Sequence, residues 1–281
     1  MKRHPVITVC WYAVNCLLIL SLGAVLYGIG WEFSTRSFLK GFSDAIIPAS
    51  DSPEQKAEAI LVWIAEGPAR QDAKNPDKLS LRDPEDTLNF QQLLQVCGTA
   101  TNAFVNLAES SGLRSRRLLL LDQNRRSKHV VAEIMVGDRW VVVDPAYHTI
   151  LRKPDGQLVT QSELRNPETF REVTKVIPDY PQSYTYESTA HVRLSRIPIF
   201  GRNLRGLLTA IWPSWEEFFN WNLLVERDSF AMLAVSLVFF CFLLAVRFLF
   251  GWYYFRRLGI ARVRLRDRIV RMSQVLAGNR L

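Results

Sequence analysis

The sequence contains few cysteines. Of its 281 residues only four are cysteine, and three of these (Cys10, Cys16 and Cys241) lie inside long apolar runs near the two ends. The polar middle of the chain therefore has Cys97 as its single thiol, which excludes an intramolecular disulfide there. A lone cysteine is most often a small buried apolar residue, so the residues around Cys97 have to indicate whether its thiol has a chemical use.

Metal-ligand clusters and nucleic-acid motifs are missing as well. The four histidines are not grouped with cysteines or carboxylates at the spacings of a zinc site, so we expect neither a metal nor a cofactor. No zinc-finger, RRM or helix-turn-helix pattern occurs, so we expect no nucleic-acid partner. The formal net charge of +8 therefore needs another explanation.

Two long stretches are apolar and have no charged residue. They are "VITVCWYAVNCLLILSLGAVLYGIGW" (6–31) and "FAMLAVSLVFFCFLLAV" (230–246), and each is close to the length of about 20 residues that a membrane-spanning helix needs. A buried core helix can look similar, but each run has basic residues on one side only. The first run is longer than the apolar part of a signal peptide and lacks a clear A-x-A cleavage site. We therefore interpret it as an uncleaved anchor.

The positive charge gathers beyond these runs, at the two ends of the chain. Two basic residues precede the first run and nine arginines follow the second, so the positive-inside rule puts both termini in the cytoplasm. The predicted localisation is a two-pass protein of the cytoplasmic (inner) membrane, with its main domain periplasmic. The predicted parts are the N-terminus with the first span (1–31), an extracytoplasmic domain with its core at about 52–150 (32–228), the second span (229–254) and a basic cytoplasmic tail (255–281).

The tail is weakly amphipathic as well as basic. One side of it carries Leu258, Leu265, Ile269, Met272 and Leu276. We expect it to rest on the anionic inner leaflet of the lipid bilayer. A protein partner in a membrane complex is the alternative.

The middle segment predicts two helices followed by a sheet. In "SDSPEQKAEAILVWIAE", Ser52 is a good N-cap and Pro53 suits the first helical position. The stretch 67–90, rich in Pro, Asp and Asn, is typical of a loop. A second helix begins near Cys97 and ends at Gly112. "RRLLLLD", "HVVAEIMV" and "RWVVVDPAY" read as strands, the last two joined by a tight turn, so the fold class is α+β with an antiparallel sheet.

This hairpin brings two ionisable residues together. If residues 137–138 form a two-residue turn, Val136 faces Arg139 and Val131 faces Asp144. Asp144 is then a diagonal neighbour of His129 on the same face of the sheet, within reach of a hydrogen bond. Cys97 at a helix start would supply a thiolate, favoured there by the helix dipole and by a nearby imidazolium.

A Cys–His–Asp set of this kind can attack a carbonyl if donors for the oxyanion are present. The backbone N–H of Cys97 is one candidate donor. The side-chain amides of Gln91, Gln92 and Gln95 lie just upstream and are further candidates. The sequence does not choose among them.

The same residues resemble the transglutaminase-like domain, a branch of the papain-like cysteine fold. The resemblance covers 52–147 and lies in "CGTATNAFVNLAESSGLRSR", where Cys97 opens a helix that leads into a strand, and in "HVVAEIMVGDRWVVVDPAY", where His129 opens one strand and Asp144-Pro145 ends the next. It implies that Cys97 is the nucleophile, that His129 is the base and that Asp144 orients His129.

Other polar residues are assigned structural roles. We expect "RSRR" (114–117) and "RRSK" (125–128) to form a solvated face, with the second cluster at the mouth of the cleft. Tyr147 and His148 are interpreted as structural or rim residues. His191 has no partner that the sequence identifies.

Two functions remain open. The first is a membrane-anchored extracytoplasmic thiol enzyme acting on amide bonds of a protein or peptide through a thioester; a water acceptor gives a protease or amidase, and an amine acceptor gives an acyl transferase or cross-linker. The second is a binding or scaffolding subunit of an envelope assembly for polysaccharide or secretion, in which the triad is vestigial or auxiliary. Partners would then bind through the spans or the tail.

Overall fold

The computed structural model describes residues 5–48, 52–67, 79–192, 201–213, 215, 224 and 227–256. The chain divides into two compact units, Met1–Tyr27 with Val235–Leu281, and Gly28–Ala234. The predicted amphipathic tail lies almost entirely outside the described residues, as does most of the aromatic segment 213–224.

Two long helices carry the apolar runs. They are α1 (Pro5–Ile46) and α10 (Asp228–Arg256). Both are long and apolar enough to cross a membrane, on length and composition alone. The apolar run occupies only the first part of α1, which continues to Ile46 because i,i+4 ion pairs such as Glu32–Arg36 and the buried Leu39 support its last turns.

The sheet of the larger unit is antiparallel, in the order β4-β3-β2-β1-β5. Its strands are β1 (Ser115–Leu121), β2 (Ser127–Val136), β3 (Arg139–Asp144), β4 (Thr149–Ile150) and β5 (Thr189–Ala190). The predicted hairpin register is confirmed, since Val136 pairs with Arg139 and Met135 with Trp140. Gly137 supports the turn with a φ of 63°.

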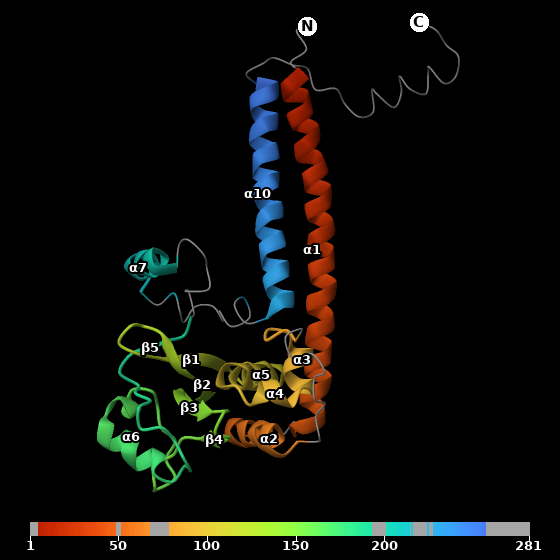
Figure 1. The fold of residues 1–281 in the computed structure, drawn as a ribbon. Coiled ribbons are helices and arrows are strands. Elements are labelled where there is room, and N and C mark those ends of the chain that lie inside the picture. The colour runs from red at the N-terminus through yellow and green to blue at the C-terminus, as the bar shows by residue number, and fades with distance from the viewer. Residues whose placement is uncertain are drawn as a thin grey trace, which may run out of the picture. The chain divides into compact units, whose positions relative to one another are not determined.

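Helices α2 (Pro53–Glu66) and α5 (Cys97–Ser110) cover one face of this sheet (Figure 1). The predicted cap of α2 is confirmed, because the Ser52 hydroxyl accepts a hydrogen bond from the Gln55 backbone N–H. The Gln55 side chain in turn accepts a hydrogen bond from the Ser52 backbone N–H. α5 is buried from Thr99 to Ala108, and its Phe104 is fully buried in the core shared with α2 and the sheet.

The loop predicted for 67–90 is partly wrong. Residues 84–89 form α3 (Pro84–Asn89), and α4 (Gln91–Leu94) follows directly. The proline that favoured a loop stands at the first position of α3, and the Asp83 side chain caps the helix at the Glu85 backbone. Pro and Asp are thus helix-starting residues here.

The other face of the sheet packs against the chain that follows β4. This layer contains η2 (Glu163–Arg165) and α6 (Pro167–Thr174), and Phe170, Tyr180 and Tyr186 fill its core against Leu118 and Val142. Figure 1 shows α6 on the side of the sheet away from α2 and α5. A further helix, α7 (Gly201–Ile211), lies beyond β5 in the sequence.

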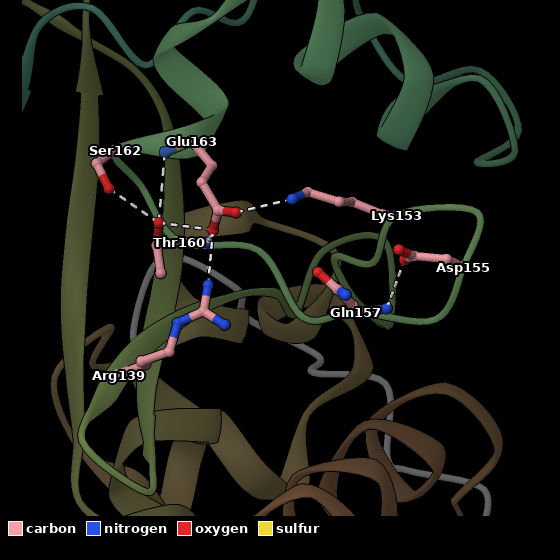
Figure 2. Close-up of polar contacts among 7 residues, drawn as sticks. All are labelled: Arg139, Lys153, Asp155, Gln157, Thr160, Ser162 and Glu163. Carbon is pink, nitrogen blue, oxygen red and sulfur yellow. Dashed lines mark hydrogen bonds and ion pairs between the residues drawn. The ribbon is translucent and has the colours of Figure 1, made fainter.

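Glu163 fastens this second layer to the hairpin (Figure 2). Its carboxylate accepts from Arg139 at 2.9 Å, from Lys153 at 2.9 Å and from the backbone and hydroxyl of Thr160. Burial opposes ionisation of Glu163, but the bonds from Lys153 and Thr160 outweigh it and lower its pKa to about 2. Glu163 therefore stays ionised and joins the start of β3 to the connection that leads into α6.

Candidate active site

Cys97 is the first residue of α5 and is half-buried. Interaction with the His129 ring, assisted by the Val130 backbone, lowers the pKa of Cys97, although partial burial opposes the shift. A hydrogen bond from the Thr101 hydroxyl to the Val130 carbonyl, at 3.0 Å, ties α5 to β2 beside the thiol. The start of the helix, the imidazole of His129 and the backbone of Val130 therefore all favour the thiolate form of Cys97.

His129 and Asp144 form the pair that the hairpin register predicts. His129 Nε2 lies 2.7 Å from Asp144 Oδ2, and both side chains are buried. The other ring nitrogen, Nδ1, is buried and has no hydrogen-bond partner within the described part of the chain, so it is the nitrogen available to the Cys97 thiol. Burial alone would lower the pKa of His129, but bonds to Asp144 and Cys97 raise it above its usual value.

Asp144 is held by three donors. Besides His129, the Tyr180 hydroxyl donates to Oδ2 at 2.9 Å and the Ala146 backbone donates to Oδ1 at 3.1 Å. Burial raises the pKa of Tyr180 far above its usual range, so its hydroxyl keeps its proton at ordinary pH. The buried carboxylate thus has hydrogen bonds on both oxygens, which is what a buried acid needs.

Aromatic rings cover the imidazole. The Tyr184 ring stacks on His129 at 4.3 Å with an interplanar angle of 7°, and Tyr147 and Tyr180 meet it edge-on. Tyr180 and Tyr184 come from the segment after α6. No pattern in the sequence predicted a role for this segment. Three tyrosines within 180–186, out of eight in the chain, were the available signal.

Donors for an oxyanion are present at the start of α5. Val96 precedes Cys97 without a side-chain cap, so no N-cap side chain takes up the first-turn N–H groups of Cys97 and Gly98. The predicted alternatives lie nearby in sequence: Gln91 and Gln92 are half-buried in α4, and Gln95 is exposed just after it. The choice among these amides stays a prediction.

The predicted solvated face at 114–117 is partly wrong, because Arg114 is exposed but Ser115 and Arg117 are buried. Arg117 is buried, with an Nη2 that would lie 3.3 Å from a Cβ at Gly98, beside the thiol. Arg116 pairs with the buried Glu133 at 2.7 Å, and Glu133 also bonds His191 at 2.9 Å. The sequence identified no partner for His191 because β5, which precedes it, pairs with β1 over a long separation. Residues 125 and 126 are exposed, as expected for the second cluster.

No group of three or more His, Cys, Asp or Glu side chains with a metal-binding arrangement occurs in the described ranges. The residues gathered around Cys97 are instead a thiol, an imidazole, a carboxylate and phenols. Side chains of these kinds are able to transfer protons and to attack a carbonyl without a metal.

The comparisons with known proteins agree with the fold. Residues 40–145 match the family model of the transglutaminase-like superfamily, so the chain contains a transglutaminase-like domain. The match includes Cys97, His129 and Asp144 and ends before the segment that carries Tyr180 and Tyr184. Searches of curated proteins and of solved structures found no match.

Proposed function

We propose that the protein is a membrane-anchored thiol enzyme that acts on amide bonds, with Cys97 as nucleophile, His129 as acid and base, and Asp144 as the residue that orients His129. The observation that carries this is the 2.7 Å contact between His129 Nε2 and Asp144 Oδ2, next to a thiol whose pKa the same imidazole lowers. The transglutaminase-like domain, common among cysteine hydrolases and transferases, supports it.

The first half of the reaction forms a thioester. The Cys97 thiolate attacks the amide carbonyl carbon, and the carbonyl electrons move to oxygen, where N–H groups of Cys97 and Gly98 stabilise the oxyanion. When the tetrahedral centre collapses, the C–N bond breaks and His129 Nδ1–H gives its proton to the leaving nitrogen. An amine departs, and the acyl group stays on sulfur.

The second half regenerates the thiolate. Neutral His129 removes a proton from the acceptor, whose oxygen or nitrogen attacks the thioester carbon. The C–S bond then breaks, leaving the thiolate beside the imidazolium. A water acceptor releases an acid and an amine acceptor releases a new amide; a protein or peptide is the proposed substrate in both cases.

Membrane attachment is part of the proposal. The apolar lengths of α1 and α10 and the basic ends support a two-pass protein with both termini in the cytoplasm and the domain outside. The bilayer would hold the enzyme close to envelope substrates or to a membrane complex.

One observation favours the second candidate, a binding or scaffolding subunit. His129 is 2% exposed, and Tyr184 stacks on its ring, so the imidazole is covered in this conformation. A permanently covered site would leave the domain as a binding surface in an envelope assembly. The reactivity of the Cys97 thiol separates the two candidates.

The test is the pH dependence of Cys97 alkylation in the full chain with Cys10, Cys16 and Cys241 replaced by serine. We expect an apparent pKa well below the value of about 8.5 for a free thiol. His129→Ala should return the apparent pKa toward that value and slow labelling at pH 6 roughly tenfold or more, because the hydrogen bond that stabilises the thiolate is lost.

His191→Ala is the matched control. It also removes an imidazole that bonds a buried carboxylate, yet its partner is Glu133 rather than a residue of the thiol site. We expect its labelling profile to equal that of the parent. An apparent pKa near that of a free thiol in the parent would overturn the enzyme proposal.

A further inference from the structure

A second polar site lies in the larger unit, away from Cys97. It is a pocket of about 240 Å³ lined by Arg36, Lys40, Glu109, Ser110 and Arg227. At about 30 Å³ per water molecule this is room for roughly eight waters, enough for a small ionic group. Two cationic side chains from α1 and one from the residue before α10 line it together with one carboxylate.

The three cationic side chains of this pocket carry more positive charge than the carboxylates that bond them neutralise. Arg227 is buried and bonds Glu32, and Arg36 Nε bonds the same carboxylate at 2.7 Å. Ser229 donates to the remaining oxygen of Glu32 at 2.8 Å. One carboxylate thus serves two guanidinium groups, while Lys40 pairs with the exposed Asp44.

The remaining charged group that lines the pocket is the carboxylate of Glu109. Burial raises the pKa of Glu109 to about 7, although Arg227 and Arg36 act against the shift. No ion pair to Glu109 is present among the residues that the structure describes. Lys56, from the neighbouring α2, donates instead to the Ser111 carbonyl at 3.0 Å. Glu109 is therefore ready to take a small cation.

The pocket lies close to the ends of the two apolar runs. Arg36 is five residues after Trp31, which ends the first run, so it lies about 7.5 Å further along the helix. Arg227 directly precedes α10, which carries the second run. The headgroup layer of a bilayer is roughly 5 to 7 Å thick on each side of the hydrocarbon core. With the spans in a membrane, as proposed above, Arg36 lies at the outer edge of the headgroup layer, and Lys40 lies about 6 Å further out.

We propose that this pocket binds a phosphoethanolamine group, with the phosphate at Arg36, Lys40 and Arg227 and the primary ammonium at Glu109. Guanidinium groups suit phosphate because their N–H donors bond its oxygens in pairs. An ammonium would form a direct ion pair with Glu109, which makes none among the described residues. The group comes either from a lipid headgroup or from a soluble phosphodiester.

Two soluble probes test the pocket in the full chain in detergent. Glycerophosphoethanolamine carries both charges and glycerophosphoglycerol carries the phosphate alone, and neither has a charged group that titrates near neutral pH. Calorimetric titration at pH 8 should show tighter binding of the first probe. As the pH falls below about 7, Glu109 takes up a proton, so binding of the first probe should weaken while binding of the second strengthens.

Two variants separate the halves of the site. Arg36→Gln with Lys40→Gln should weaken both probes roughly tenfold or more. Glu109→Gln should remove the preference for the ethanolamine probe and keep phosphate binding. The matched control is Arg171→Gln with Lys175→Gln, which removes two exposed cations at the same i,i+4 spacing and should change nothing.

Nanodiscs distinguish the two sources of the ligand. If the protein retains phosphatidylethanolamine over phosphatidylglycerol but does not bind the soluble probe, the ligand is a lipid headgroup. If the soluble probe binds, a free phosphodiester is sufficient as the ligand. The proposal is overturned if neither the soluble probes nor the lipids show a preference for the ethanolamine group. It is also overturned if the control variant loses as much binding as Arg36→Gln with Lys40→Gln. Chemical denaturation reports whether each variant is folded, so this result is independent of the outcome for the proposed enzyme.

Discussion

Two histidine–carboxylate pairs lie on the same sheet. His129 Nε2 is 2.7 Å from Asp144 Oδ2, and His191 Nε2 is 2.9 Å from Glu133 Oε2. The pairs differ in what else touches the carboxylate. Glu133 also bonds the permanent cation of Arg116, whereas Asp144 bonds the neutral Tyr180 hydroxyl and the Ala146 amide. The negative charge of Asp144 therefore acts on His129 without a competing cation.

The different partners of the two carboxylates also affect the pKa values of the neighbouring groups. At Glu133, burial is outweighed by the bonds from His191 and Arg116, and the pKa of the carboxyl is lowered. At the other pair the effect passes through the imidazole, whose pKa is raised, to the Cys97 thiol, whose pKa is lowered. Similar distances thus occur in an ion-paired cluster at Glu133 and in the proposed proton-transfer pair at Asp144, and the third group bonded to each carboxylate distinguishes them.

The largest expected effect comes from removing one carboxylate of each pair. Asp144→Ala and Glu133→Ala both leave buried partners unsatisfied, so each should lower the free energy of unfolding by about 2 to 5 kcal/mol. Asp144→Ala should also slow Cys97 alkylation at pH 6 roughly 10- to 100-fold, because His129 loses the charge that keeps it protonated. Glu133→Ala should leave the apparent thiol pKa unchanged.

Chemical denaturation and the alkylation profile check this pair of variants. An equal change of the thiol pKa in both would show that fold stability, and not the charge of Asp144, controls the thiol. Asp144→Asn is the conservative variant, since it keeps an acceptor for His129 without the charge.

Removal of the neutral donor on Asp144 should have an intermediate effect. Tyr180→Phe deletes the 2.9 Å bond to Oδ2 and should cost about 0.5 to 1.5 kcal/mol of stability. We expect alkylation of Cys97 to slow roughly threefold, with a broader pH profile, because the carboxylate is less well oriented. Tyr184→Phe keeps the ring stacked on His129 and serves as control. A Tyr180→Phe profile identical to the parent's would give Tyr180 a purely structural role.

Local sequence signals were enough to predict the site where the partners are close along the chain. A Gly-Asp turn and the strands on either side fix the hairpin register, and the register alone brings His129 to Asp144. The helix beginning at Cys97 follows from its buried apolar positions and from Gly112, whose φ is 79°.

Contacts across long sequence separations could not be predicted in this way. Tyr180 reaches Asp144 from a segment with little regular structure, so no periodicity indicates the contact. Arg117 and His191 look like surface residues because burial of a charged group depends on partners brought in by the fold. The stacking of Tyr184 on the His129 ring, which bears most on function, is also a contact across a long sequence separation.

The smallest effect is expected at a third carboxylate, which contacts neither pair. Glu163 accepts from Arg139 and Lys153, and its side chain is 30% exposed, so solvent screens these ion pairs. Glu163→Gln should cost about 1 kcal/mol or less near neutral pH. The folded pKa is lowered to about 2 from 4.5, so this contribution is complete above about pH 4.5 and disappears as the pH falls toward 2. Unfolding of the parent and the variant at pH 7 and pH 3 should therefore show a gap that narrows on acidification, while Cys97 alkylation stays the same in both. A gap that widens at low pH would contradict the lowered pKa. A change in alkylation would mean that the thiol responds to any loosening of the second layer, and the contrast between the two histidine pairs would then lose its electrostatic basis.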